Sequence, residues 1–196
     1  MSLHADAVRT LDAWIAPDPA QESMRLRFLD HLLDHADGLS RYCAPAHITA
    51  SALIVSPERG EVLLVLHAKA GTWLQTGGHC EPRDPTLAAA ALREATEESG
   101  IAGLTLTEAP VRLDRHPAPC HRGVVEHHLD VQYLAIAPPG ARPTRSAESL
   151  DLAWFPFDAL PSPSDVQHLV AYASANSAPE VWVTPSRKPR ARSARG

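Results

Sequence analysis

The 196 residues suffice for one domain of ordinary size, and 44% hydrophobic with 21% charged residues is the balance of a soluble globular protein. The net charge of -5 combines an acidic body with a basic end, where residues 187–196 hold five Lys and Arg and no acid. An acidic body argues against a nucleic-acid-binding surface, which needs clustered Lys and Arg.

Neither a disulfide framework nor a targeting signal is indicated. The three cysteines are widely spaced and include no Cys-x-x-Cys pair. Charged residues interrupt the first 15 positions, and no apolar run approaches the ~20 residues that a membrane helix needs. We therefore expect a cytoplasmic protein without membrane contacts. The Arg- and Ser-rich end, residues 184–196, is expected to be a disordered basic tail.

Two helices are expected at residues 4–15 and 20–36, as an N-terminal helical extension over residues 1–45 that packs on the body or on a partner. In the second helix the apolar residues are spaced as a stripe, formed by Met24, Leu26, Phe28, Leu29, Leu32 and Leu33. Alternating residues from 47 to 54, a turn at 56–60 and an apolar run at 62–66 then predict a hairpin or two adjacent strands.

A glycine-bearing loop over residues 71–83 precedes one strong helix. Asp84 or Thr86 is suited to cap its start, Pro85 fits its first turn, and Gly100 is placed to end it. Further strands at 104–111, 124–136 and 152–157 and a closing helix at 164–174 complete the pattern. Strands around a central helix, with helices at both ends, predict an α/β sandwich over residues 46–183.

The central helix carries three carboxylates on one arc of its surface. Glu94, Glu97 and Glu98 stand at i, i+3 and i+4, while the opposite stripe is apolar and small. Like charges at this spacing cost about 0.2–0.5 kcal/mol per pair on an isolated helix. One interpretation is that the carboxylates simply face solvent, since Arg-Glu-x-x-Glu-Glu is common on exposed helix faces. A divalent cation would offset the repulsion, and Mg²⁺ takes hard oxygen ligands.

The surrounding residues resemble the Nudix box, Gly-x5-Glu-x7-Arg-Glu-U-x-Glu-Glu-x-Gly-U with U aliphatic. The matching positions are Gly78, Arg93, Glu94, Ala95, Glu97, Glu98, Gly100 and Ile101. Six fixed identities at set spacing arise by chance with odds on the order of 10⁻⁷ per position. Asp84 replaces the first Glu of the box, and eight residues instead of seven separate it from Arg93. The extra residue precedes the helix, so only the role of Asp84 stays open. The resemblance covers roughly residues 46–160.

This resemblance implies the α/β/α sandwich of the Nudix superfamily, with a mixed sheet. It also implies hydrolysis of a phosphoanhydride bond in a nucleoside diphosphate linked to another moiety, with Mg²⁺, or Mn²⁺ in its place, as cofactor. The implied metal ligands are Glu94, Glu97, Glu98 and the backbone carbonyl near Gly78. Glu97 and Glu98 are the implied catalytic carboxylates, and Arg93 is implied to orient Glu94.

The general base and the substrate contacts are left open by the sequence. Alternation along residues 124–136 places Glu126, His128 and Asp130 on one face, which either lines the cleft or faces solvent. The candidates for the base are Glu97, Glu98, Glu126, Asp130, Glu148 and Asp151. The substrate-binding candidates are His79, Trp73 and Glu126. His79 either contacts phosphate or braces its loop, and Trp73, Tyr133 and Trp154 either stack on a base or belong to the core.

The expected partner is a small-molecule nucleotide or diphosphate, and a homodimer is left open. One rival interpretation is a zinc nucleobase deaminase, since residues 79–81 fit His-x-Glu and Cys120 lies downstream, but residue 123 is Gly where a second cysteine is needed. The other is a non-catalytic Nudix domain that binds a nucleotide or has a regulatory role. Three intact carboxylates argue against it.

Overall fold

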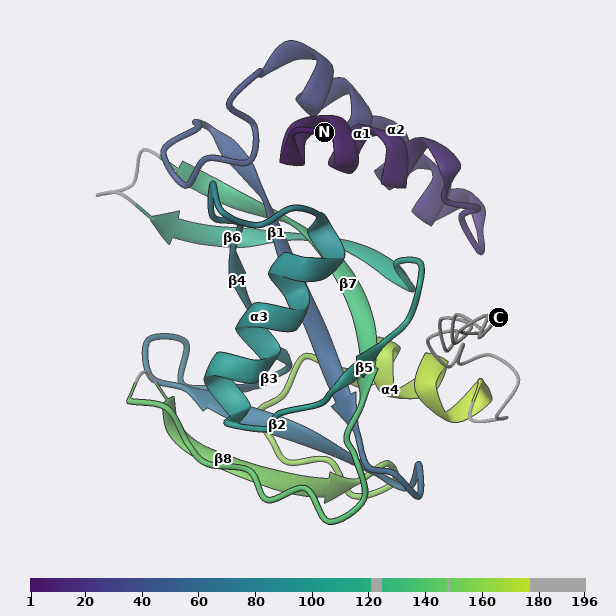
Figure 1. Ribbon diagram of the computed structural model, residues 1–196, viewed down its shortest axis with the longest axis vertical. Coiled ribbons are helices and arrows are strands. Elements are labelled where there is room, and N and C mark those ends of the chain that lie inside the picture. Colours follow the sequence, from purple (N-terminus) through teal and green to yellow (C-terminus); the bar gives the residue numbers. More distant parts are fainter. Residues whose placement is uncertain (121–124, 148, 177–196) are drawn as a thin grey trace, which may run out of the picture.

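The computed structural model describes residues 1–120, 125–147 and 149–176, without the side chains of residues 119, 120, 125 and 126 (Figure 1). The predicted tail at 184–196, the Glu126 side chain and Glu148 therefore lie outside the described residues. The elements in chain order are α1 (Leu3–Ala13), α2 (Pro19–Asp34), β1 (Ala46–Val55), β2 (Glu61–His67), β3 (Trp73–Leu74), β4 (Thr76–His79), α3 (Leu87–Ser99), β5 (Thr105–Leu106), β6 (Arg112–Cys120), β7 (Val125–Ile136), β8 (Ser149–Pro156) and α4 (Gln167–Ala175).

The described strands form one mixed sheet of eight strands with β1 at its centre. β1 pairs in parallel with β7 along its whole length, and all the other pairings between named strands are antiparallel. On its other edge β1 pairs with β4 through residues 49–52 and with β2 through residues 54–55. The predicted pairing of the segments at 47–54 and 62–66 is confirmed.

Helices cover both faces of the sheet, which confirms the α/β/α sandwich. Ile48 and Ile54 of β1 belong to a core cluster with α1, α2 and α3, whereas Leu53 and Val55 belong to a second cluster with α4. Figure 1 shows α3 lying along the sheet, with α1 and α2 at one end of the molecule. Among the described residues, no helix combines the length and apolarity that crossing a membrane requires.

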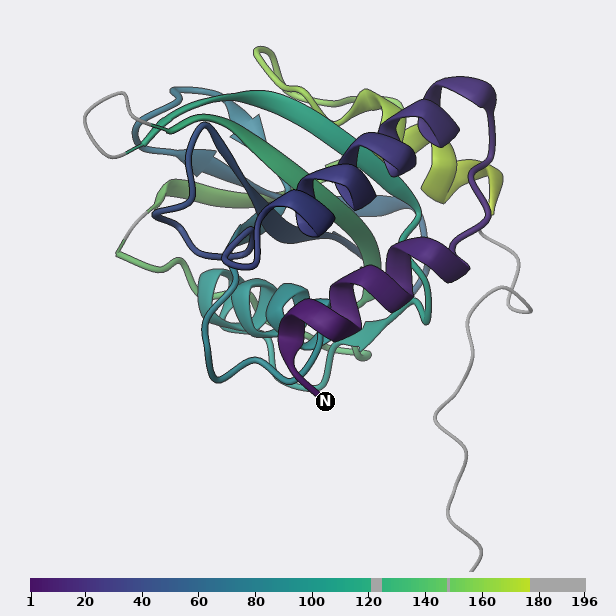
Figure 2. The ribbon, with the colours of Figure 1, turned by 90° about the horizontal axis from the view of Figure 1, so that it is seen from above.

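The N-terminal helices pack on the body and share its core, side by side as seen in Figure 2. Phe28 and Leu32 of the predicted stripe are buried, but Leu26 and Leu33 are exposed, so the stripe is narrower than expected. The inner face of α2 instead includes Gln21, whose side-chain amide both donates to the carbonyl of Leu113 and accepts from its N–H, at 3.1 and 2.8 Å. This reciprocal pair fastens α2 to strand β6.

The structure corrects two predictions made from the sequence, one for a loop and one for a strand. The segment at 71–83 contains the short strands β3 and β4, and the strand expected at 104–111 is reduced to the two residues of β5. Strand β6 was not predicted, because Pro117 and charged residues interrupt its apolar pattern. Among the described strands β6 pairs with β7 alone, and an edge position tolerates proline because one side of the strand needs no ladder hydrogen bonds.

Candidate active site

Helix α3 is held at both ends, which fixes the position of its three carboxylates. The hydroxyl of Thr86, and not Asp84, caps the start by accepting from the N–H of Ala89 at 3.0 Å. Gly100 ends the helix with a φ of 67°, a left-handed conformation that glycine adopts without strain. Ala91 and Ala95 are fully buried, and their small side chains let the helix lie close to the sheet.

A carboxylate from α1 also reaches the start of α3. The buried Asp6 accepts a hydrogen bond from the backbone N–H of Leu87 at 2.9 Å. The first N–H groups of a helix have no partner within the helix, and the positive end of its dipole favours a negative charge. The N-terminal extension thereby stabilises the helix that carries the acidic residues, a contact that no local sequence signal indicated.

Arg93 is the centre of a hydrogen-bond network that joins α3 to the preceding loop. Its Nε and Nη2 donate to the two carboxylate oxygens of Asp84, each at 3.0 Å. Its Nη2 also donates to the carbonyl oxygen of His79 at 2.9 Å, and its Nη1 donates to Glu94 at 2.8 Å. A guanidinium that uses its fork on one carboxylate is fixed in orientation. Arg93 can therefore position Glu94 without contacting substrate.

The structure thus gives Asp84 a definite place. Burial by itself would raise the pKa of this carboxyl, but the hydrogen bond from Arg93 and one from the backbone N–H of Glu81 outweigh it and lower the pKa below its usual value. The same bond to Asp84 raises the pKa of Arg93. The one-residue insertion ahead of the helix is therefore compatible with a bidentate contact between Asp84 and Arg93.

Two glycines allow the loop and the helix to approach each other. A Cβ on Gly78 would lie 2.8 Å from the carboxyl carbon of Glu94, and one on Gly77 would lie 2.3 Å from Cβ of Ser51. The backbone N–H of Gly77 donates to Glu98 at 3.0 Å. Glu97 accepts from Arg93 at 3.1 Å, and its side chain is 51% exposed. The three glutamates therefore differ: Glu94 is held by Arg93, Glu98 is bonded to the loop backbone at Gly77, and Glu97 is the exposed one.

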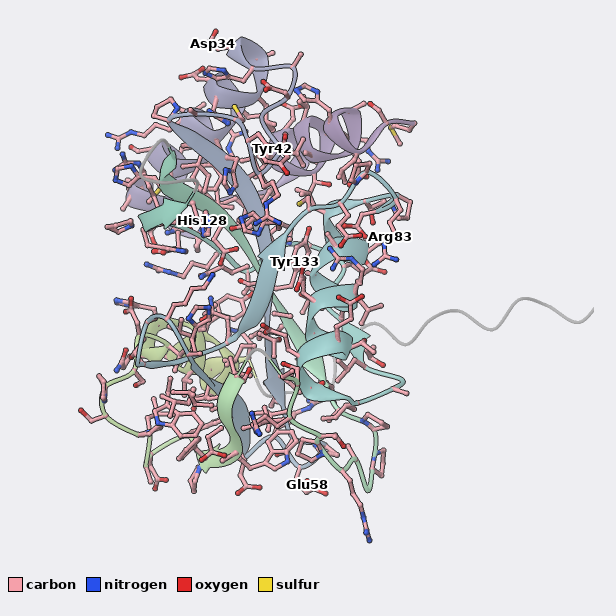
Figure 3. All side chains as sticks on the ribbon, turned by 90° about the vertical axis from the view of Figure 1, so that its left-hand side faces the viewer. Asp34, Tyr42, Glu58, Arg83, His128 and Tyr133 are labelled. Carbon is pink, nitrogen blue, oxygen red and sulfur yellow. The ribbon has the colours of Figure 1, made fainter. Side chains whose placement is uncertain are left out.

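These residues lie along a large cleft, a cavity of about 1630 Å³. Its walls include Gly78, Arg93 and all three glutamates, and its floor is a polar part of the sheet. Side chains on the adjacent strands β4, β1, β7 and β6 form this floor in two rows. In one row the paired residues are, in that strand order, His79, Thr49, Asp130 and Asp114. In the next row they are His47 of β1, His128 of β7 and His116 of β6. Figure 3 labels His128 on β7 and, on the loop before α3, Arg83.

The predicted substrate contacts are distributed unequally. His79 lines the cleft, and its ring centroid lies 5.0 Å from that of His47 and 5.2 Å from that of His128. Trp73 lies outside the set of described residues that line the cleft. It is partly buried and packs edge-to-face on Phe155 at 4.8 Å, against the core cluster that includes α4. The side chain of Glu126 is outside the described residues.

Some of the remaining candidates for the general base line the cleft and others do not. His128 and Asp130 lie on the same face of β7, as the alternation predicts, and of the two alternatives that the sequence left open for this face they take the one that lines the cleft. Asp130 is buried and accepts from the hydroxyls of Thr49 and Ser51 at 2.9 and 2.6 Å. Asp151 is exposed on β8 and is not among the described residues that line the cleft. Of the described candidates, Glu97, Glu98 and Asp130 therefore share the cleft.

The histidines of the floor have opposite electrostatic tendencies. Burial, followed by the three neighbouring histidines, lowers the pKa of His128 to about 3. Burial also opposes the charged form of His116, but its hydrogen bond with Asp114 at 2.9 Å and the nearby Asp130 outweigh this effect and raise its pKa. The floor therefore combines a neutral imidazole with one that favours protonation.

Comparisons with known proteins identify the family to which the chain belongs. A family model described as the NUDIX domain matches residues 45–174. The chain belongs to the Nudix family. A NUDIX-family hydrolase from Clostridium perfringens is 25% identical, with a TM-score of 0.52, and the match covers 66% of this chain and 94% of that one.

Two further solved structures resemble this Nudix hydrolase. A MutT NUDIX hydrolase from Burkholderia pseudomallei is 29% identical, with a TM-score of 0.47 and coverage of 65% and 95% of the two chains. An Ap4A hydrolase from C. elegans, solved as a binary complex, is 23% identical, with a TM-score of 0.50 and coverage of 66% and 90%. A search of curated proteins gave no match.

Membership of the Nudix family overturns the interpretation as a zinc deaminase. Cys120 and Gly123, on which the deaminase pattern depended, lie outside the residues whose side chains are described.

Proposed function

We propose that this Nudix hydrolase cleaves a phosphoanhydride bond in a nucleoside diphosphate linked to a second moiety, in a reaction that depends on Mg²⁺. The observation that carries the proposal is the gathering of Glu94, Glu97 and Glu98 on one wall of the cleft, beside the Gly77-Gly78 backbone. A cleft of about 1630 Å³ exceeds the ~300–1,000 Å³ typical of ligand pockets and leaves room for a substrate of dinucleotide size.

The residues present fit a hard divalent cation. Three carboxylates supply oxygen donors, the type of ligand that Mg²⁺ takes. Gly78 lacks the side-chain carbon that would collide with Glu94, so its backbone can approach the same position. We propose Glu94, Glu97, Glu98 and the carbonyl of Gly78 as the metal-binding groups. When bound, Mg²⁺ neutralises the diphosphate and makes a water molecule more acidic.

The chain's own residues then divide the remaining tasks. Arg93 is a positioning residue, because its guanidinium holds Glu94 from one side while it is itself fixed by Asp84. Glu98 ties the helix to the loop through the N–H of Gly77. Glu97 is more exposed than Glu98, and it accepts hydrogen bonds from Arg93 at 3.1 Å and from the exposed Arg83 at 3.5 Å, so water reaches its carboxylate. We propose Glu97 as the general base ahead of Glu98, with Asp130 as the competing group on the floor.

The test is a screen of the full chain against ADP-ribose, dinucleoside polyphosphates, oxidised nucleotides, nucleotide sugars and coenzyme A, each with and without Mg²⁺. We expect release of a nucleoside monophosphate or diphosphate from at least one compound, only with the metal. Replacement of Mg²⁺ by Mn²⁺ is expected to support turnover.

Site variants make the screen decisive. Glu97→Gln and Glu98→Gln should each lower kcat/KM by a factor on the order of 10²–10⁴, the contribution typical of acid–base groups, while the circular dichroism spectrum stays unchanged. Glu108→Gln is the matched control, since Glu108 is exposed in the bend after β5 and is not among the described residues that line the cleft. Full activity in both glutamine variants would refute the assigned site, and an absence of Mg²⁺-dependent product across the panel would refute the reaction.

A further inference from the structure

Three histidines from three strands meet at the floor of the cleft. His47 of β1, His79 of β4 and His128 of β7 each offer one ring nitrogen, and these three nitrogens lie within 4.8 Å of one another. Their ring centroids are separated by 4.9 to 5.2 Å, so the rings form a nearly equilateral triangle. Strand pairing imposes this meeting, because His47 is opposite His128 and His79 is opposite the neighbouring Thr49.

The size of this triangle suits a transition-metal ion. Three atoms no more than 4.8 Å apart enclose a point within about 2.8 Å of each, so shifts below about 1 Å would give the ~2.0–2.1 Å of a zinc–nitrogen bond. Rotation of imidazole rings about their side-chain bonds can supply such shifts without moving the strands. His47 is fully buried behind the other two, whereas His79 and His128 line the cleft, which gives an ion a route of entry.

The donor chemistry separates this cluster from the carboxylates of α3. Imidazole nitrogen is a ligand for zinc, copper, nickel and iron, whereas Mg²⁺ takes oxygen ligands. Three protein ligands with a fourth position open to a cavity is the arrangement of zinc sites that also hold water or substrate. His79 follows Gly77-Gly78 directly, and its carbonyl accepts from Arg93 at 2.9 Å, so one short segment contacts both groups.

We propose that His47, His79 and His128 form a second metal site, which binds a divalent transition ion of the zinc type and is distinct from the magnesium site at Glu94, Glu97 and Glu98. The open coordination position faces the cleft. His79 thereby acts through its side chain as a metal ligand, instead of contacting phosphate or bracing the loop. The site fastens three strands together at the end of the cleft that adjoins the catalytic helix.

The probe is Zn²⁺ itself, added to the chelator-stripped full chain in competition with a chromophoric chelator. The decisive background is the triple variant Glu94→Gln, Glu97→Gln, Glu98→Gln, which removes the carboxylates that also attract zinc. We expect this variant to retain one tightly bound zinc per chain. His47→Gln or His128→Gln in that background should weaken binding by more than about 100-fold, beyond the effect of losing an outer-shell partner.

His127→Gln is the matched control, because His127 precedes His128 on the same strand and is not one of the three clustered histidines. This variant should bind zinc as its parent does. A second readout needs no histidine substitution: in the triple variant labelled with ¹⁵N-histidine, one equivalent of Zn²⁺ should shift the ring signals of three of the 11 histidines.

The outcomes separate cleanly. The site is supported if the triple variant retains one zinc, if substitution of His47 or His128 in that variant removes it, and if three histidine rings shift. The site is overturned if substitution of the three glutamates removes all zinc binding, if both histidine variants keep the affinity of their parent, or if fewer than three rings shift. If a histidine variant fails to fold, the NMR titration of the triple variant, which keeps all its histidines, decides. Because zinc binding is measured without turnover, failure of the second site leaves the proposed hydrolysis intact.

Discussion

The pairing of Asp84 with Arg93 offers the sharpest test of how the active site is built. Asp84→Asn preserves the shape of the side chain but places an amide NH₂ against a guanidinium, which only donates. One of the two charged hydrogen bonds, each 3.0 Å long, is therefore lost. A hydrogen bond to a charged group contributes about 1.5–3 kcal/mol. The Asp84 and Arg93 side chains are only 5% and 14% exposed, so little solvent screening reduces this value.

We therefore expect Asp84→Asn to lower the free energy of unfolding by about 2 kcal/mol, and Tm by roughly 4–8 °C for a chain of this size. Denaturant titrations at a series of pH values would measure it. The pKa of Asp84 is lowered in the folded state, so its stabilisation is complete above its ordinary value of 3.8 and is lost as the pH falls through the folded value. The difference between wild type and variant should be constant from about pH 5 to 8 and shrink below about pH 4.

Asp158→Asn is the control for this experiment. Asp158 lies exposed in a turn, where a substitution usually changes stability by less than about 0.5 kcal/mol. If Asp84→Asn were no more destabilising than this control at pH 7, or if its effect grew on acidification, the bidentate contact could not be the support that we describe. Activity gives an independent check, since a loosened Arg93 should also reduce kcat through Glu94.

Three further outcomes are expected. Gly78→Ala introduces a carbon 2.8 Å from the carboxyl carbon of Glu94 and should lower kcat/KM by about 10- to 100-fold with little loss of stability, in steady-state kinetics and thermal melts. Asp6→Ala removes the acceptor at the start of α3 and should cost about 0.5–2 kcal/mol in denaturant titrations; an unchanged midpoint would exclude this contact as a cap. The His116 ring should titrate above pH 6.5 by NMR. Because its pKa is raised, the stabilisation lost in His116→Asn should be present below pH 6.5, disappear as the pH rises through the folded value, and stay below about 1 kcal/mol for this partly exposed pair.

Local signals identified the parts of the molecule that depend on local structure. The start and end of α3 follow from Thr86 and Gly100, and the alignment of its carboxylates follows from helical spacing alone. The alternation in β1 likewise predicted which residues share a face, although both faces are buried here. Leu26 and Leu33 of α2 departed from the predicted stripe because the helix contacts the body through a face that includes the polar Gln21.

The features that escaped prediction depend on strand register and on contacts between distant segments. Nothing near Asp84 indicates that it binds Arg93, because the extra residue before the helix shifts it out of the family spacing. His47, His79 and His128 are far apart in sequence, and only the pairing of β1 with β4 and β7 places them side by side. Asp6 is an ordinary helix residue until α1 is packed against α3.

The bond between Gln21 and Leu113 bears on any attempt to work with the family-matched region alone. A recombinant fragment cut at residue 45 would keep all the described strands but lose α2 and the side-chain amide of Gln21, which pairs with the backbone N–H and carbonyl of Leu113 in β6. It would also uncover apolar side chains that Phe28 and Leu32 now shield. An uncovered strand edge next to an exposed apolar surface promotes association between chains. Such a fragment should therefore aggregate under conditions in which the full chain stays monodisperse.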